Sequence, residues 1–372
     1  MSLVTDIGAF RGVQAFCREG EVELVVFPDK LGIASSLSQE LEKVDGLVAV
    51  APYLDQALSE QERLRACGWF GMQGNAADRP QVDLDNAAAG RLAARHLMEL
   101  GLQRFVFVHN PLSERSWERF RGFREELESL GHPVAEFERG SRMPKGRWTA
   151  QDQLEDIVAF LPTVETPFGV FAYDDSHGLR VMEAARIKGL RVPKDLAVVA
   201  TSAHHTACSF YTPSITTVIN NMWDQGFESA RLLVERLRGE TQEFFRSCRP
   251  GGLVARGSTQ ISHAADPLVA GALDWLHQNP PSEWKVAAMS EALACSQMTL
   301  LRRFRAALGT TPKTVMQHRR VAIARRELVD TNDGFTEIAH RCGFADSAHF
   351  TRCIRDSTGQ SPTEIRARLG SA

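Results

Sequence analysis

The sequence predicts an α/β region with a doubly wound parallel sheet, followed by an all-α domain with two helix-turn-helix units. Three observations support this. Short, continuously apolar runs alternate with helical stretches up to about residue 258. Strand-like patterning stops near 259–266, and helical periodicity follows without a break. In the helical part, a segment that ends in GTTP at 309–312 recurs fifty residues later and ends in GQSP at 359–362.

The length and composition are those of a multidomain globular protein. At 372 residues, the chain is long enough for several domains, each with its own core. No apolar run approaches the roughly 18 to 20 residues that a membrane helix requires. The N-terminus lacks the basic start and long apolar stretch of a signal peptide. We therefore expect a cytoplasmic protein with no membrane partner.

Cysteine and histidine usage favours neither disulfides nor metals. The seven cysteines are odd in number and include no CxxC pair, so we expect all of them to be reduced. His204 and His205 are adjacent and point to different sides of an extended chain, which argues against a metal site shared with His109 or His177. We expect no metal and no cofactor.

Charge is distributed unevenly along the chain. The net charge is −3, but from residue 264 onward 14 Lys and Arg accompany 11 Asp and Glu. Residues 1–263 carry 29 Lys and Arg against 35 Asp and Glu. A basic C-terminal part suggests a polyanion partner, although a difference of this size is also found on an ordinary solvated face.

The α/β region contains several strand-like runs separated by helices. Because these runs are continuously hydrophobic, they indicate a parallel sheet covered on both faces. Residues 82–108 resemble one βαβ crossover, with Asp85 or Asn86 as the N-cap of its helix and Gly101 at its end. Ligand sites in such sheets lie beyond the carboxyl ends of the strands. The predicted strands fall at 22–27, 45–52, 104–110, 168–175 and 196–202, and further helices at 116–131, 175–193 and 220–239.

The C-terminal repeat consists of two similar helical units. Each unit has a helix, a tight turn and a second helix, with apolar residues at helical spacing on the inner face. In the second unit, Gly343 can adopt the positive φ that ends the first helix, and Ala339 permits close helix crossing. At an offset of fifty the aligned pairs are Leu300 and Phe350, Arg302 and Arg352, and Phe304 and Ile354; Met289 and Ile338, and Ser290 and Ala339, correspond if the second turn is one residue longer.

Two such units can present two helices to one face of DNA. The connecting helix expected at 312–331 would hold them so that they enter successive major grooves about 34 Å apart. Without the repeat, a helical packing module with solvating arginines would explain the pattern about as well. The repeat favours a DNA-binding module.

Three segments carry a resemblance to the DNA-binding domain of AraC/XylS-type regulators, which extends over about 105 residues. They are SQMTLLRRFRAALGTTP, RRVAIARRELV and EIAHRCGFADSAHFTRCIRDSTGQSPTEIR. Two positions depart from the family pattern: Ala294 replaces a common helix-ending glycine, at about 1 kcal/mol of turn strain, and Ile354 replaces a Phe. The resemblance implies base contacts by Gln297, Met298, Leu301, Arg302, Ser347, Ala348, Thr351 and Arg352, and we expect phosphate contacts by Arg303, Arg305 and Arg355.

The N-terminal part resembles the periplasmic-binding-protein-like core of lactose and galactose repressors over residues 8–257. The segments that carry this resemblance are FRGVQAF, VDLDNAAAGRLAARHLMELG, RFRGF, FAYDDSHGLRVMEAARIKGLRVPKDLAVVA and PSITTVINNMWDQGFESARLLV. The order of the two parts is similar to that of xylose-operon regulators. The resemblance implies two lobes joined by three crossovers, which close around a small ligand.

This organisation gives explicit boundaries. We expect a sensor at 1–260, a linker at 261–266 and a DNA-binding domain at 267–372. Lobe one would hold about 1–109 and 219–242, and lobe two about 110–218 and 243–258.

The same resemblance implies a set of ligand-binding residues. Arg119 occupies the position whose planar fork clasps sugar hydroxyls or a carboxylate. Asp85, Asp174, Asp175 and Asn220 match further ligand positions. As alternatives, Asp85 and Asp175 could only cap helices, and Asn220 could only serve a crossover. Ser202 stands where the family usually has an Asp, and a neutral hydroxyl cannot replace a bidentate carboxylate acceptor, which makes xylose doubtful as the ligand.

The resemblances together imply a sequence-specific DNA-binding transcription regulator controlled by a small molecule, a sugar or a sugar derivative. Its expected partners are double-stranded promoter DNA, a second copy in a homodimer and, for an activator, RNA polymerase. One alternative is a regulator with a degenerate cleft that responds to a protein partner or to no ligand. Another is an α/β enzyme fused to a DNA-binding module, although no G-x-S-x-G elbow, P-loop or H-E-x-x-H helix occurs.

A sheet of this kind needs a central first strand before residue 8, yet only SLVT is available there. Either that strand is very short, or the natural chain begins upstream and MSL is an added remnant. We favour the upstream start.

Overall fold

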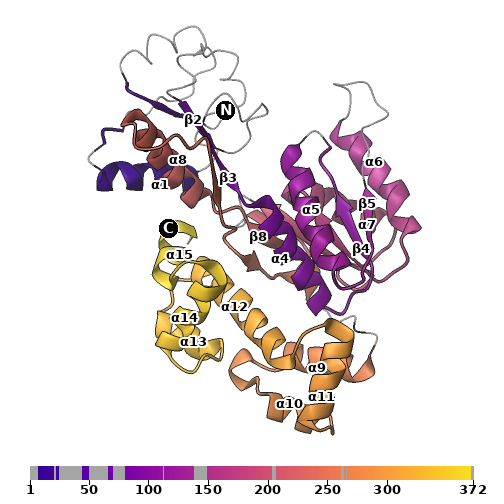
Figure 1. Cartoon of the computed structure of the whole chain (residues 1–372). Coiled ribbons are helices and arrows are strands. Elements are labelled where there is room, and N and C mark those ends of the chain that lie inside the picture. Colours follow the sequence, from indigo (N-terminus) through magenta and orange to yellow (C-terminus); the bar gives the residue numbers. More distant parts are fainter. Residues whose placement is uncertain are drawn as a thin grey trace. The chain divides into compact units, whose positions relative to one another are not determined.

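A computed structural model describes residues 7–20, 22–24, 44–49, 66–69, 80–111, 113–137, 149–202, 207–260, 264 and 266–369. The chain forms two compact units, Met1–Asp85 with Asn220–Arg249 and Asn86–Ile219 with Pro250–Ala372 (Figure 1). It therefore passes between the units three times, the number of crossovers that the sequence predicts.

Unit 1 holds a parallel sheet with two helices packed together. Among the described residues its strand order is β1-β2-β3-β9, with every pair parallel. α1 and α8 approach closely, since a Cβ added at Gly12 would lie 2.0 Å from the Trp223 carbonyl oxygen. The elements are α1 (Ile7–Glu19), β1 (Leu47–Ala49), β2 (Ala66–Trp69), β3 (Gln81–Leu84), α8 (Met222–Leu237) and β9 (Phe245–Cys248).

The α/β part of unit 2, residues 86–219 and 250–260, is built around a second sheet. Its described strands have the order β10-β8-β7-β6-β4-β5. All pairs are parallel except that of the edge strand β10 with β8. The strands are β4 (Phe105–Val108), β5 (Val134–Phe137), β6 (Phe168–Ala172), β7 (Leu196–Ser202), β8 (Thr216–Ile219) and β10 (Leu253–Val254), and the helices are α4 (Asn86–Glu99), α5 (Glu114–Glu128), α6 (Ala150–Phe160), η3 (Leu161–Thr163), α7 (Asp175–Ile187), η4 (Ala207–Phe210) and η5 (Gly257–Thr259).

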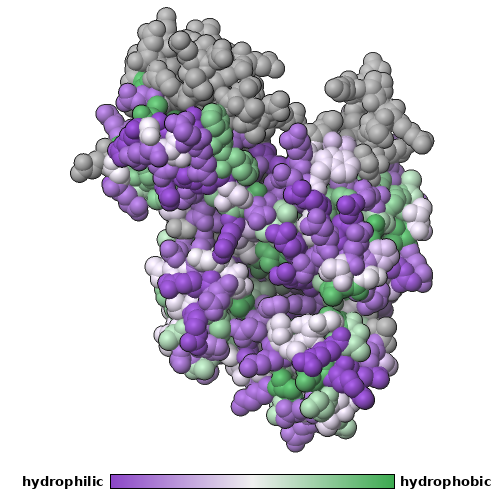
Figure 2. All heavy atoms as spheres, viewed as in Figure 1, coloured by the Kyte–Doolittle hydropathy of each residue, from purple (hydrophilic) through white to green (hydrophobic). Residues whose placement is uncertain are grey.

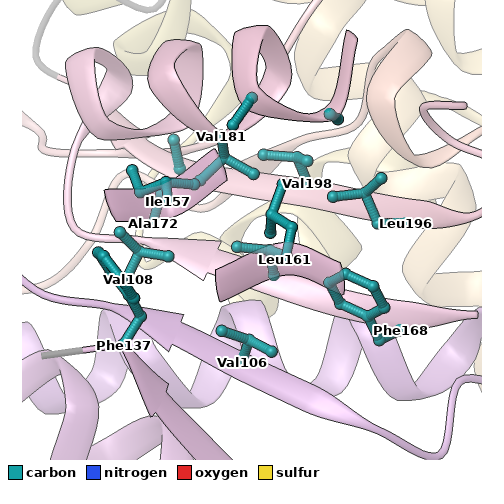
Figure 3. Close-up of a cluster of buried hydrophobic side chains, with 14 of the residues drawn as sticks. Val106, Val108, Phe137, Ile157, Leu161, Phe168, Ala172, Val181, Leu196 and Val198 are labelled. Carbon is teal, nitrogen blue, oxygen red and sulfur yellow. The ribbon is translucent and has the colours of Figure 1, made fainter. Parts of the chain in front are cut away.

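A hydrophobic core joins this sheet to helices α6 and α7. Strand residues such as Val106, Phe168 and Val198 are fully buried and meet Ile157 of α6 and Val181 of α7 (Figure 3). The strands β6 and β7 are buried at every position. Continuous burial of parallel strands explains why their sequences are apolar throughout instead of alternating.

The expected lobe boundaries are wrong in two places. The sequence predicts one βαβ crossover over 82–108, but β3 lies in the sheet of unit 1 and β4 in that of unit 2. Residues 243–249, expected in lobe two, hold β9, which pairs with β3. Sequential strands are neighbours in only about two-thirds of cases, so a local pattern cannot specify the sheet to which a strand belongs.

Helix packing explains why α4 belongs to unit 2. A Cβ added at Gly90 of α4 would lie 2.1 Å from the Arg119 carbonyl oxygen of α5, and one at Gly122 would lie 2.0 Å from that of Ala87. The two helices therefore cross through facing glycines. This close contact holds residues 86–99 against α5.

From Pro267 onward every described element is a helix. The elements are α9 (Pro267–Gln278), η6 (Pro281–Glu283), α10 (Val286–Ala292), α11 (Gln297–Leu308), α12 (Pro312–Asp330), α13 (Phe335–Arg341), α14 (Ser347–Thr358) and α15 (Pro362–Leu369). The sequence-based extents of sensor, linker and DNA-binding domain remain predictions.

Two expectations concern parts of the chain that are not fully described. Residues 22–24 form no strand, and the remainder of the strand predicted at 22–27 lies outside the described residues. The expected short first strand before residue 8 also falls largely outside them.

Candidate functional site

The two helical units follow the same local plan. The second helix of each unit, α11 or α14, begins with a side-chain cap: Ser296 accepts from the Thr299 amide at 3.0 Å, and Asp346 accepts from the His349 amide at 2.6 Å. Each helix ends at a left-handed glycine, Gly309 or Gly359. The fifty-residue offset in the sequence therefore corresponds to a repeated structure.

Each unit has its own hydrophobic core. Leu300 and Phe304 of α11 are fully buried in one cluster, and Phe350 and Ile354 of α14 are fully buried in another. The connecting helix α12 contributes to both, since its Ile323 packs against each cluster. Because α12 is shared, it fixes the spacing between the two units.

Of the predicted base-contacting residues, Met298 and Arg302 of α11 and Ala348 and Arg352 of α14 lie on the helix faces opposite these cores. Met298 is 72% exposed. Gln297, Arg302, Ala348 and Arg352 are also exposed, whereas Leu301, Ser347 and Thr351 are half-buried. The Ser347 hydroxyl lies 3.1 Å from that of Thr336 in α13, so it has an intramolecular partner as well. On the face shown in Figure 2, hydrophilic residues cover most of the described surface.

The three predicted phosphate contacts differ in their surroundings. Arg305 and Arg355 are exposed and hold equivalent positions on the outward sides of α11 and α14. Arg303 is also exposed, but its Nε lies 2.6 Å from Asp266, the N-cap of α9. A phosphate contact by Arg303 would have to compete with this ion pair.

In unit 2, four predicted ligand residues gather at the carboxyl edge of the second sheet. Asp174 and Asp175 follow β6, and Ser202 ends β7. Arg119 reaches the same edge from α5, where its Nη1 donates to the Tyr173 carbonyl oxygen at 2.6 Å. This is the position that a doubly wound sheet offers to ligands.

Arg119 is held rigidly although it is almost fully buried. Its Nε donates to Asn86 Oδ1 at 2.9 Å, and its guanidinium lies 4.7 Å from the centre of the Tyr173 ring. The Asn86 amide in turn donates to Glu118 at 3.0 Å. These contacts orient the guanidinium fork and leave a buried cation beside the sheet edge.

The two neighbouring aspartates have different roles. Asp174 caps α7 and accepts from the His177 amide at 2.9 Å, and its Oδ1 lies 2.6 Å from His177 Nδ1. Burial opposes ionisation of Asp174, but the hydrogen bonds and charge of His177 outweigh it and lower the pKa to about 2. The Asp175 carboxylate instead accepts from the Ser202 hydroxyl at 2.8 Å. Ser202 has no carboxylate of its own, but its hydroxyl positions the carboxylate of Asp175.

Asp85 and Asn220 belong to unit 1, whereas the four residues above belong to unit 2. The Asp85 amide donates to the Cys248 carbonyl oxygen at 2.7 Å, next to the first crossing of the chain. The Asn220 carbonyl oxygen accepts from Gln225, and within the described part of the chain its buried Oδ1 has no hydrogen-bond partner. Asn220 therefore offers an unused acceptor beside the second crossing.

Sequence reasoning missed the residues that position the others. The sequence predicts Asn86 only as a helix cap and predicts no role for Tyr173, yet both hold Arg119. Trp117, which could stack on a sugar face, is 38% exposed, and its ring lies 4.2 Å from that of His109. The only sequence signal for Tyr173 is its place between a buried strand and the aspartate pair.

The described residues contain neither a membrane-spanning helix nor a metal-binding cluster. None of their helices is both long and apolar enough to cross a membrane. No group of three or more His, Cys, Asp or Glu in this part of the chain could hold a metal ion.

Two domain families match the chain. A periplasmic binding protein-like domain matches residues 94–259, and a helix-turn-helix domain matches residues 289–368. The two matches correspond to the α/β part and the helical part.

One relative and two solved structures match two thirds or more of the chain. The xylose operon regulatory protein of Haemophilus influenzae is 25% identical over 77% of this chain and 74% of its own length. A solved xylose-binding transcription activator matches with a TM-score of 0.58 and 20% identity over 98% of this chain and 95% of its own, a likeness of fold. The regulator CelR in complex with cellobiose matches with a TM-score of 0.52 and 28% identity over 68% of this chain and 78% of its own.

The matches agree with the geometry of both parts. The chain joins a periplasmic binding protein-like domain to a helix-turn-helix domain of the AraC type, and it is a ligand-controlled, DNA-binding transcription regulator of that architecture.

Proposed function

We propose that α11 and α14 read successive major grooves of a promoter, and that a sugar or sugar derivative bound by the α/β part controls this binding. The proposal rests on two equivalent outward faces, one on α11 and one on α14. The two helices lie fifty residues apart in the sequence, and each begins with a side-chain N-cap and ends at a left-handed glycine. A major groove admits a helix, and two grooves on one face of DNA lie about 34 Å apart.

Different side chains on these faces suit different contacts. Arg302 and Arg352 carry planar forks that match the two acceptors of guanine. Met298 and Leu301 are apolar and suit thymine methyl groups. Arg305 and Arg355, one turn further along, suit phosphate and would fix the register of the protein on the duplex.

The proposed ligand site pairs a cation with an anion. Arg119 offers donors and Asp175 offers an acceptor, and sugar hydroxyls can use both. Ser202 cannot accept two hydroxyls as an aspartate would, but it orients Asp175 at 2.8 Å. The relatives are named as a xylose operon regulatory protein, a xylose-binding transcription activator and a regulator in complex with cellobiose. These names also support a sugar as the ligand. Because Ser202 stands where the family usually has an Asp, we expect a sugar other than xylose.

Titration with sugars tests this proposal. The full chain would be titrated with pentoses, hexoses and sugar acids while tryptophan fluorescence is followed, and any co-purifying small molecule would be identified by mass spectrometry. A saturable response to one sugar is expected. Arg119→Ala should abolish this response. It should leave binding to duplex DNA intact, because Arg119 lies in the α/β part and the reading helices α11 and α14 lie in the helical part.

A specific observation also favours a regulator with a degenerate cleft. The Asp175 carboxylate and the Ser202 hydroxyl satisfy each other, so neither requires a ligand. In that case no sugar would change the fluorescence, and a protein partner would be sought. Catalytic turnover of a sugar would instead favour an enzyme, an alternative that the names of the relatives as regulators do not support.

The remaining partners complete the proposal. A homodimer would let two chains grip paired operator sites. RNA polymerase would be a further partner if the protein activates transcription. Because its proposed target is promoter DNA, we expect the protein to act in the cytoplasm.

A further inference from the structure

The second and third crossings of the chain are joined by hydrogen bonds in unit 2. The Ile219 amide donates to the Gly252 carbonyl oxygen at 2.9 Å, and the Gly251 amide donates to the Ile219 carbonyl oxygen at 2.9 Å. Residues 219 and 250 are the last and first residues of unit 2 at these crossings. The backbone at 250–252 therefore directly adjoins two of the three crossings.

The connecting helix α12 lies against this same backbone. Gly252 has a φ of 90°, and a Cβ added there would lie 2.6 Å from Arg325 Cζ and 2.7 Å from Arg325 Nε. The guanidinium thus rests directly on the Gly252 backbone. A side chain at residue 252 would collide with it.

Among the residues that the structure describes, Arg325 has no hydrogen-bond acceptor in this position. It is only 1% exposed, and within the described part of the chain none of its three guanidinium nitrogens has a hydrogen-bond partner. Burial lowers its pKa to about 9, so the group is still charged at neutral pH. A buried charge without a partner is destabilising, and an apolar side chain of similar size would pack there at lower cost.

A second contact docks the same helix on the α/β part. His318 Nδ1 lies 2.5 Å from Glu99 Oε1 at the end of α4. His318 precedes Arg325 by seven residues, which places both on one face of α12. One end of the docking face is therefore favourably paired, and the other carries an unpaired charge beside the crossing.

We propose that Arg325 keeps the docking of α12 on the α/β part reversible and makes it sensitive to the backbone at Gly252. Movement of that backbone gives the guanidinium an acceptor or releases it, and α12 carries the change to both reading helices. The inference depends on the proposed function in one respect. It takes the sugar proposed there as the ligand that moves the units.

Hydrogen exchange of the full chain tests the docking directly. Exchange would be measured by mass spectrometry for peptides over 250–254 and 312–330, in the wild type and in Arg325→Met. Removal of the unpaired charge should slow exchange in both peptides by about tenfold or more. Arg326→Met changes a neighbouring, more exposed arginine on the same helix and should leave exchange as in the wild type.

A second variant keeps the test decisive. Gly252→Ala places a Cβ against the guanidinium and should speed exchange in α12, the opposite of Arg325→Met. Unchanged or faster exchange in a folded Arg325→Met would overturn the inference, because the arginine would then not weaken the docking. If Arg325→Met does not fold, slower or unchanged exchange of α12 in Gly252→Ala would overturn it.

The functional arm separates this inference from the proposed function. A duplex selected by the wild-type chain from a random pool would be titrated with and without D-xylose, or with another sugar that alters the fluorescence. Arg325→Met should bring the ratio of the two duplex affinities close to one while sugar affinity changes by less than about threefold. A wild-type ratio in Arg325→Met would overturn the inference. If no sugar alters duplex binding by the wild type, the proposed function fails, and the exchange experiment still decides the role of Arg325.

Discussion

The two helix-turn-helix units share a plan but differ in the turn between their helices. The residue in the left-handed conformation is Ala294 in the first unit, with a φ of 50°, and Gly343 in the second, with a φ of 75°. Ala294 is exposed, whereas a Cβ added at Gly343 would lie 2.1 Å from the Pro281 carbonyl oxygen. The first turn accepts a side chain at the cost of backbone strain, and the second has no space for one.

The difference follows from what each turn faces. Arg320 of α12 donates to the carbonyl oxygens of Pro281 at 3.0 Å and Trp284 at 2.6 Å, so it ties this segment of the first unit to the connecting helix. Gly343 packs against the same segment. The second turn is therefore part of the contact between the units, and the first turn faces solvent.

The largest effect is expected from Gly343→Ala. Left-handed strain of about 1 to 2 kcal/mol and a collision with backbone should together destabilise the second unit by about 3 kcal/mol. Hydrogen exchange over 335–358 and urea unfolding would measure the loss. Gly189→Ala is the matched control, because Gly189 has a φ of 70° and no atom within 4 Å of an added Cβ. Equal losses in the two variants would show that the second turn is no more confined than an open one.

Arg302→Ala and Arg352→Ala test whether the two units contribute equally to reading. Each should weaken binding to a selected duplex by about 1 to 3 kcal/mol, with little effect on sugar binding. Titration with selected and random duplexes gives the specific part of the affinity. Arg186→Ala, on the exposed surface of α7, should change neither. A loss in only one variant would assign base recognition to that unit alone.

The sequence predicted the repeat because its signals are local. Caps, glycines and buried positions such as Leu300 and Phe350 recur at one offset, and the structure keeps them equivalent. The left-handed strain at Ala294 was likewise expected from the absence of glycine. The boundary between the lobes could not be obtained in this way, because the pairing of β9 with β3 joins residues that are far apart in the sequence.

The ligand edge was only partly predictable for the same reason. The family pattern identifies Arg119 and Asp175 as candidates, but the orientation of Arg119 depends on Tyr173, which follows β6, and that of Asp175 depends on Ser202, which ends β7. Nor does any local pattern show that Arg325 is buried against Gly252. An arginine on an amphipathic helix is normally expected in solvent.

Salt dependence should separate the three candidate phosphate contacts. Arg305→Gln and Arg355→Gln should each reduce the slope of log affinity against log salt concentration by about 1, because each removes one phosphate contact. Arg303→Gln should reduce it less, since Arg303 pairs with Asp266 at 2.6 Å. Affinities for one duplex at several salt concentrations give these slopes. An equal reduction in all three variants would show that Arg303 leaves Asp266 when the protein binds DNA.

The smallest effect is expected from Ala294→Gly, which makes the first turn resemble the second. Glycine relieves the left-handed strain of about 1 to 2 kcal/mol but increases the entropy of the unfolded chain, so the net stabilisation should be about 0.5 to 1 kcal/mol. Ala292→Gly, two residues earlier at the end of α10, should instead destabilise by about 1 kcal/mol, because residue 292 is helical. Urea unfolding of both variants measures the two signs. Destabilisation by Ala294→Gly would mean that Ala294 is unstrained, and that the units differ in sequence but not in the energy of their turns.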